Sequence, residues 1–178
     1  MIGKRQFRNE ESSKPHNVTI VYLATALLWF GWFGFNGASA IGATPRAAMA
    51  AFVTTGKTFL ILAAASAGGL AWVLVDKMRG KKISGIGFCT GAIAGLVGIT
   101  PGSGYVAPWA SLIIGVITSI GCNASSYLKK FMPFDDSLDS CALHGVGGVI
   151  GNLLVLGHFN IGRYFCSEMG SITGWLSY

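Results

Sequence analysis

The sequence predicts an all-α membrane protein with five transmembrane helices, on the basis of its composition and the arrangement of its apolar residues. The chain has 178 residues, of which 52% are hydrophobic and 11% are charged. Soluble domains are typically about 25% charged, so this chain is unusually poor in charge. Its apolar residues fall into five blocks, each close to the ~20 residues that a spanning helix needs. A large soluble core is the alternative explanation.

The predicted spans cover residues 18–40, 47–75, 83–100, 105–128 and 140–159. The second span is long enough to be tilted, kinked or partly outside the bilayer. Because the linkers are short, we expect one compact domain from residue 18 to residue 159.

Polar or unassigned tails are expected on either side of this domain. Residues 1–17 are polar and mixed in charge, which is unlike a cleavable signal peptide. Residues 160–178 match no pattern that assigns them a role. We therefore treat 1–17 and 160–178 as two tails outside the transmembrane domain.

The basic residues predict the orientation of the chain. Ten of the 13 Lys and Arg residues precede span one, follow span two or follow span four, whereas the opposite segments carry only Arg46 and Arg163. The positive-inside rule then places the amino end in the cytoplasm and the carboxyl end outside the cell. Nucleic-acid binding is the other use of a net charge of +6, but the basic residues form no patch interleaved with aromatic residues.

Glycine spacing predicts close helix contacts. Gly87, Gly91 and Gly95 recur every four residues in the third span, and Gly147 and Gly151 do so in the fifth. In lipid, small residues allow two backbones to approach closely and make van der Waals contact. The pattern favours a tightly packed bundle and names no activity.

Aromatic and polar residues share one face of the first span. Trp32, then Phe35 or Asn36, and Ser39 are three or four residues apart and stack along a helix. Such a face can replace water around a small cation through the aromatic quadrupole and a hydrogen bond. An interfacial aromatic belt is the simpler explanation, and the spacing alone favours it.

The fifth span contains a histidine among glycines. An ionisable ring is costly in hydrocarbon when charged, so His144 is a candidate for a functional site as a neutral imidazole. A hydrogen-bonded structural histidine is the more common alternative. Asp135, Asp136 and Asp139 precede this span, where acidic groups favour the helix dipole, so helix capping is the simplest role for at least one of them.

Lys57 belongs to a loose phosphate-loop pattern at residues 51–58, with alanine in place of the first glycine. The nucleotide-binding mechanism needs a strand, a loop and a helix in water, together with an acidic partner for magnesium. The segment lies in an apolar run, so we expect Lys57 to extend to the membrane surface or to mark a local irregularity.

Four stretches carry a further signal: residues 28–37, 46–52, 91–101, and 135–139 followed by 143–148. Together, and in their order and spacing, they resemble the ammonium transporter family (Amt/Mep/Rh), and most closely its fungal Mep branch. The resemblance covers roughly residues 15–157, except for a stretch near 54–63 that looks longer than in the family.

The resemblance implies half of an inverted-repeat fold. The family has an eleven-helix bundle, usually trimeric, in which two five-helix halves are related by inverted symmetry. This chain resembles family helices six to ten, so the first half and the last helix are expected to be missing. The expected partners are ammonium or ammonia, the lipid bilayer, and other ammonium transporter chains in a homo- or hetero-trimer.

The resemblance also implies roles for individual residues. Phe35 resembles a gate phenylalanine, Ser39 the hydroxyl of the outer ammonium site, and Trp32 an aromatic residue lining the same region. His144 resembles one of two paired pore histidines. Asp136 and Asp139 resemble the acidic residues of the cytoplasmic vestibule. The partner histidine and the other gate phenylalanine would lie in the missing half.

Two functional hypotheses follow. The first is transport of ammonium or ammonia through a dry pore lined by histidine, at the plasma membrane and incomplete in this chain. The second is a non-conducting subunit or fragment that associates with full-length relatives. Neither hypothesis predicts an enzyme, a metal or a cofactor.

Overall fold

The computed structural model describes residues 16–38, 55–103, 106, 108–128, 136 and 139–157, with the backbone alone at 37, 38, 55–61, 108 and 128. Within these ranges the ordered structure is entirely helical. The long helices are α1 (Val18–Ala38), α3 (Thr55–Met78), α4 (Gly85–Ile99) and α5 (Pro108–Leu128). A short 3-10 helix, η2 (Thr100–Gly102), follows α4, and a π-helical turn, η4 (Cys141–Val146), opens a last helix that runs to Gly157.

These helices confirm the predicted helical segments to within a few residues, except in the second segment. Three of them are long and apolar enough to cross a membrane: Val18–Asn36, Gly85–Gly102 and Trp109–Tyr127. The last helix, Cys141–Gly157, is apolar but shorter. In the second segment, α3 has 24 residues and begins at Thr55, whereas the predicted span began at residue 47. Residues 47–54 lie outside the described part of the chain.

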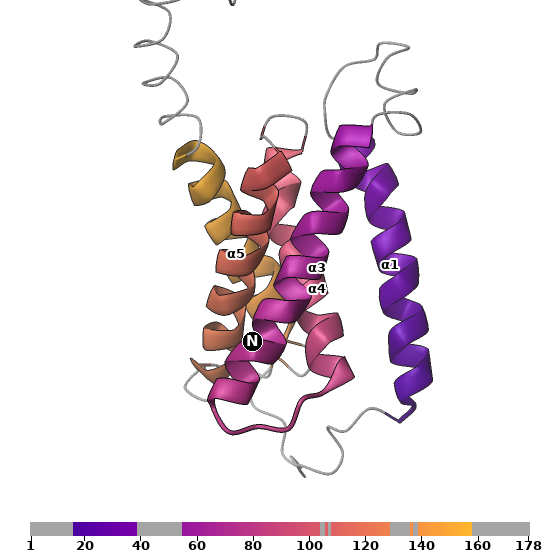
Figure 1. Ribbon diagram of the computed structural model, residues 1–178, viewed down its shortest axis with the longest axis vertical. Helices are drawn as coiled ribbons and strands as arrows, with labels where there is room; N and C mark the ends of the chain where they lie inside the picture. Colours follow the sequence, from indigo (N-terminus) through magenta and orange to yellow (C-terminus); the bar gives the residue numbers. More distant parts are fainter. Residues whose placement is uncertain are drawn as a thin grey trace, which may run out of the picture.

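The helices alternate in direction along the bundle (Figure 1). Helix α3 packs against α4 and α5, and α4 also contacts α1 and η4. The link between α3 and α4 lies at the same end of the bundle as the start of α1 (Figure 1). This alternation is the one that the charge pattern requires if its basic segments are to share a side.

Local signals in the sequence set several helix ends. The side chain of Asn17 accepts hydrogen bonds from the amides of Thr19 (2.9 Å) and Ile20 (3.3 Å), which caps the start of α1. Gly80 has a φ of 75° and follows α3. The Gly80 amide donates to the Lys77 carbonyl, and the Lys81 amide donates to the Asp76 carbonyl, both at 3.0 Å. This is a Schellman arrangement, and it requires the left-handed conformation that glycine adopts readily.

The centre of the bundle is built from small residues. Ala64 and Ala65 of α3 are fully buried against α4 and α5. A methyl group placed on Gly95 of α4 would lie 2.2 Å from the Ala64 carbonyl oxygen, and one on Gly115 of α5 would lie 2.4 Å from the same atom. The backbones therefore approach closely, and the Ser119 hydroxyl donates to a carbonyl of α3 at 2.6 Å.

The last helix docks on α4 in the same way. A methyl group on Gly151 would lie 2.4 Å from the carbonyl oxygen of Gly98. A methyl group on Gly147 would lie 3.1 Å from the Cys122 sulfur and 3.3 Å from a side-chain carbon of Val97. The glycine spacing in the third and fifth predicted spans therefore marks real helix contacts, as predicted.

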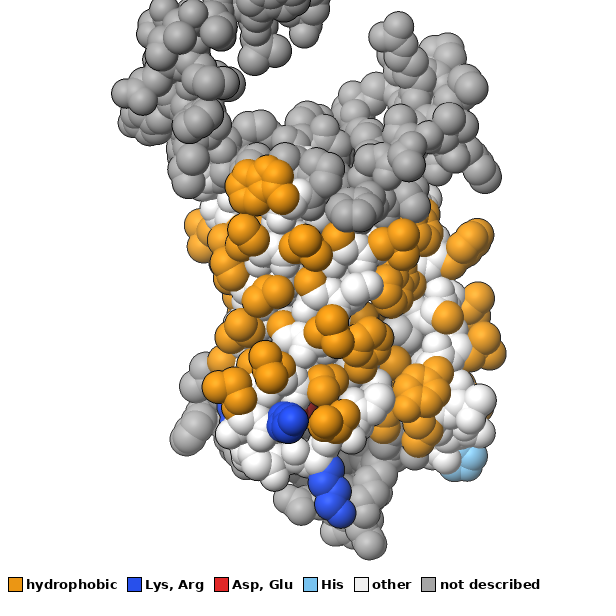
Figure 2. Space-filling model, in the orientation of Figure 1, with side chains coloured by type: hydrophobic (Ala, Val, Ile, Leu, Met, Phe, Trp, Pro, Cys, Tyr) orange, Lys and Arg blue, Asp and Glu red, His pale blue; other side chains and the backbone are white. Residues whose placement is uncertain are grey.

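The outer surface is largely apolar. Figure 2 shows hydrophobic side chains over most of the described face, with lysine or arginine gathered at one end. Leu23, Leu27 and Phe30 of α1 are all more than half exposed. This distribution is the reverse of that in a soluble domain and suits a bundle surrounded by lipid or by other apolar helices.

We expect Gly95→Ala to destabilise the bundle. The added methyl would collide with backbone of α3, which cannot move away as a side chain can, so the free energy of unfolding should fall by about 1–3 kcal/mol. Gly31→Ala is the matched control, because a methyl group there meets no atom of the described residues within 4 Å. The measurement is unfolding by denaturing detergent, followed by circular dichroism. Equal stability of the two variants would contradict the close contact.

Candidate functional site

The aromatic face predicted on α1 is present. The ring centroids of Trp32 and Phe35 are 5.6 Å apart and their planes are inclined by 52°. This tilted arrangement is one that aromatic pairs prefer. Phe35 is 57% exposed, so much of its ring is accessible on the surface of the chain.

A hydrogen bond between helices fixes the Trp32 ring. Its indole Nε1 donates to the Thr100 hydroxyl at 2.9 Å, and that hydroxyl donates to the Leu96 carbonyl at 2.7 Å. A tryptophan in a simple interfacial belt needs no such partner. The orientation of Trp32 is therefore set by the end of α4, and Phe35 packs against a ring that is held in place.

Asn36 lies beside this pair and is only 2% exposed. Among the described residues, neither its amide nitrogen nor its amide oxygen has a hydrogen-bond partner. An unsatisfied buried polar group costs about 1–3 kcal/mol, so a polar partner is expected here. Ser39, predicted on the same face, lies outside the described residues, as does Arg46.

His144 lies in the π-helical turn η4 and is exposed. Its neighbour Gly145 is also exposed, and no side chain of the described structure seals the ring from outside. Single π-helical turns inside α-helices are rare and occur often at functional sites. The sequence did not predict this π-helical turn, because glycines like those around His144 also occur in ordinary α-helices.

A polar stripe continues from His144 along the last helix. The Asn152 amide is exposed and donates to the Gly148 carbonyl at 2.8 Å. His144, Gly148 and Asn152 follow one another at four-residue intervals, so they lie along one side of the helix. Large apolar residues occupy the adjacent side, where Val149 and Leu153 are 60% and 63% exposed.

Asp136 caps the last helix. Its two carboxylate oxygens accept hydrogen bonds from the amides of Ser140 (2.8 Å) and Cys141 (2.9 Å). Asp139 has a φ of 54°, and its carbonyl accepts a bond from the Leu143 amide at 2.8 Å. The capping role expected for at least one aspartate is therefore confirmed for Asp136, and Asp135 is outside the described residues.

The phosphate-loop pattern gains no support. The backbone of Lys57 belongs to α3, two residues after its start, while its side chain and residues 51–54 are outside the described part. Across the described ranges, no group of three His, Cys, Asp or Glu side chains could hold a metal ion.

The predicted site residues come from both sides of α4. Trp32 and Phe35 are brought together on α1, and His144 lies on the last helix, which contacts α4 through η4. Reasoning from the sequence missed Thr100 as the partner of Trp32. The two are 68 residues apart, and no local signal links them.

Comparison with known proteins identifies relatives of the whole region. The sequence model described as Ammonium Transporter Family matches residues 1–177. Ammonium transporter 1 of Schizosaccharomyces pombe is 49% identical over 154 residues, which is 86% of this chain and 30% of that protein. The Ammonium transporter of Bacillus subtilis is 44% identical over 86% of this chain and 36% of its own length.

Solved structures give the same result. The crystal structure of Saccharomyces cerevisiae Mep2 superposes with a TM-score of 0.68 at 48% identity, covering 80% of this chain and 30% of that one. Candida albicans Mep2 superposes with a TM-score of 0.67 at 46% identity, over 78% of this chain and 29% of that one. This chain thus spans about a third of the length of these relatives.

We expect Thr100→Val to release the Trp32 ring. Valine has the shape of threonine but accepts no hydrogen bond, so the free energy of unfolding should fall by about 1 kcal/mol. Ultraviolet resonance Raman difference spectra against Trp32→Phe should show a weaker indole hydrogen bond, and Thr100→Ser should preserve it. An unchanged indole band in Thr100→Val would mean that the contact does not hold the ring.

Asp136→Ala should loosen the start of the last helix. Two charge-assisted hydrogen bonds are lost at a helix amino end, which lowers stability by about 1–2 kcal/mol. Hydrogen exchange at the Ser140 and Cys141 amides should accelerate, and Asp136→Asn, which keeps one acceptor oxygen, should be intermediate. Unaltered exchange at both amides would contradict the cap.

Proposed function

The chain belongs to the ammonium transporter family, and we infer from this that it forms part of a pathway for ammonium or ammonia across a membrane. The observation that carries the inference is the family match over residues 1–177, joined to 49% identity with a protein named as an ammonium transporter. The apolar helices agree with an integral membrane protein. The plasma membrane, with the amino end in the cytoplasm, is the location that we propose.

The aromatic pair suits the entrance of such a pathway. An ammonium ion that sheds water can be attracted to the face of a tryptophan or phenylalanine ring. Trp32 is held rigidly by Thr100, so less entropy is lost when a cation is bound beside it. We propose Trp32 and Phe35 as entrance and gate residues, with the Ser39 hydroxyl as the hydrogen-bond acceptor.

The polar stripe on the last helix suits the pathway itself. An ammonium ion becomes much cheaper to move through an apolar conduit once it has lost a proton. Ammonia can then meet the neutral imidazole of His144 in place of hydrocarbon. Potassium has no proton to lose, so it cannot follow by the same route, and this difference would give selectivity.

The rest of the wall of the proposed pathway has to come from residues outside this chain. Because the chain spans about 30% of its fungal relatives, we propose that the exposed faces carrying Phe35 and His144 are covered by a complementary half. The inverted-repeat arrangement and the trimer belong to this proposal. Asp136 and Asp139 would then lie near the cytoplasmic vestibule, Asp136 with a capping role as well.

The test is uptake of labelled methylammonium by a cell lacking its own ammonium transporters. The chain is produced alone and together with a full-length relative. We expect uptake that depends on this chain to fall to background in His144→Ala and Phe35→Ala. Val149→Ala and Phe30→Ala are the matched controls, since both side chains are exposed on the same helices.

The outcomes separate the hypotheses. Loss of uptake only in the two site variants supports the pathway. No uptake alone, with altered uptake by the co-produced relative, supports the non-conducting subunit. Absence of any effect in either setting, from a chain shown to reach the membrane, contradicts both.

A further inference from the structure

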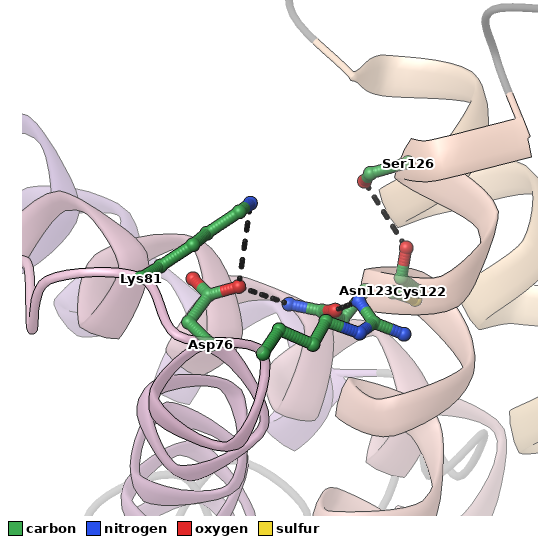
Figure 3. Close-up of polar contacts among 6 residues, drawn as sticks. Asp76, Lys81, Cys122, Asn123 and Ser126 are labelled. Atoms are coloured by element: carbon green, nitrogen blue, oxygen red, sulfur yellow. Dashed lines mark hydrogen bonds and ion pairs between the residues drawn. The ribbon is translucent and has the colours of Figure 1, made fainter.

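A polar network joins the ends of α3 and α5 where the α3–α4 link, residues 79–84, begins. The Asn123 amide donates to the Asp76 carboxylate at 3.2 Å, and the Lys81 ammonium lies 3.6 Å from the same oxygen. Arg79 donates to the Asn123 side-chain oxygen. Figure 3 shows Lys81 and Asn123 converging on Asp76 from two elements. Asn123 is 1% exposed, so the network is anchored in the bundle.

Both cations also lie over one aromatic ring. The Arg79 guanidinium carbon is 4.3 Å from the centre of the Tyr127 ring, and the Lys81 nitrogen is 4.5 Å from it. Each contact is favourable by itself. Two like charges held on one ring nevertheless repel each other, and an anion placed between them would relieve the repulsion.

Positive charges outnumber negative ones around this network. Asp76 is shared by Asn123 and Lys81, whereas Arg79 contacts neutral groups in the described structure: the side-chain amide of Asn123 and the ring and hydroxyl of Tyr127. Lys77 and Lys82 are exposed close by in sequence and add to the positive charge. Hydrogen bonding to Tyr127 and the charge of Asp76 raise the pKa of Lys81 above its usual 10.5.

Exposed apolar side chains lie close to these cations along the sequence. Leu74, Met78 and Ile83 precede or follow them within a few residues and are 58%, 79% and 66% exposed. Figure 2 shows basic side chains at the end of an otherwise hydrophobic face. A small inorganic anion would use only the charges, whereas a lipid would use the charges and the apolar rim together.

We propose that Arg79 and Lys81, held against Tyr127, bind the phosphate headgroup of an anionic membrane lipid. The guanidinium fork suits two phosphate oxygens, and the lysine adds a compact point charge. The acyl chains lie along the exposed residues at the end of α3. Clusters of basic residues next to a membrane helix are a recognised basis for binding anionic lipid. The site is independent of the proposed transport function.

The experiment titrates the detergent-solubilised chain with short-chain phosphatidylserine and measures lipid-bound protein by native mass spectrometry. Replacing both Arg79 and Lys81 with Gln should lower affinity by about tenfold or more, because two charge-assisted contacts are lost. Replacing both Lys77 and Lys82 with Gln removes the same charge from the same region. Screening at about 0.15 M salt should limit that control to about twofold.

Three results would overturn the proposal: equal losses in the two double variants, equal binding of phosphatidylcholine, or inorganic phosphate binding as tightly as the lipid. Equal losses would indicate general attraction to positive charge. Arg79→Lys keeps the charge but removes the fork, so it tests the site if the double variant fails to fold. This variant should weaken binding.

Discussion

The close approach of backbones between α3, α4, α5 and the last helix is the constraint on which this structure depends. In lipid there is no gain from hiding apolar side chains from water, so helices associate through contact and hydrogen bonds. Ala64 supplies one carbonyl against which both Gly95 and Gly115 pack, and Gly98 does the same for Gly151. Larger residues at these points would separate four helices at once. The apolar side chains that would fill a soluble core are instead directed outward.

The end of helix α4 connects this packing to the candidate site. Near its end, Gly98 receives the last helix, and two residues later Thr100 binds Trp32 of α1. The two helices with candidate site residues are therefore positioned by one short stretch, residues 98–100, where α4 ends and η2 begins. A disturbance at residues 98–100 would move the aromatic pair and His144 relative to each other, even though neither belongs to α4.

The sequence was sufficient for what depends on composition and local spacing. The long apolar blocks predicted the helices, and the four-residue glycine repeats predicted Gly91, Gly95 and Gly151 as points of helix contact. It was not sufficient for contacts between distant residues, such as Trp32 with Thr100 or Asp76 with Asn123. The sequence also did not predict the π-helical turn at Cys141–Val146, because no amino-acid composition distinguishes such a turn from an α-helix. Capping by Asp136 was one of several roles that its position allowed.

The last helix offers a physical argument about which of its surfaces meets lipid. Val149, Leu153 and Leu156 are each about 60% exposed on one side, and they are the side chains that hydrocarbon accepts without penalty. His144 and Asn152 are exposed on the adjacent side, where the Asn152 amide donates to the Gly148 carbonyl of its own helix. Leaving imidazole and amide groups in lipid costs several kcal/mol, roughly. A bundle that could place leucine on both sides would gain stability by doing so, and polar groups in such positions are expected where a conduit or another polar surface faces them.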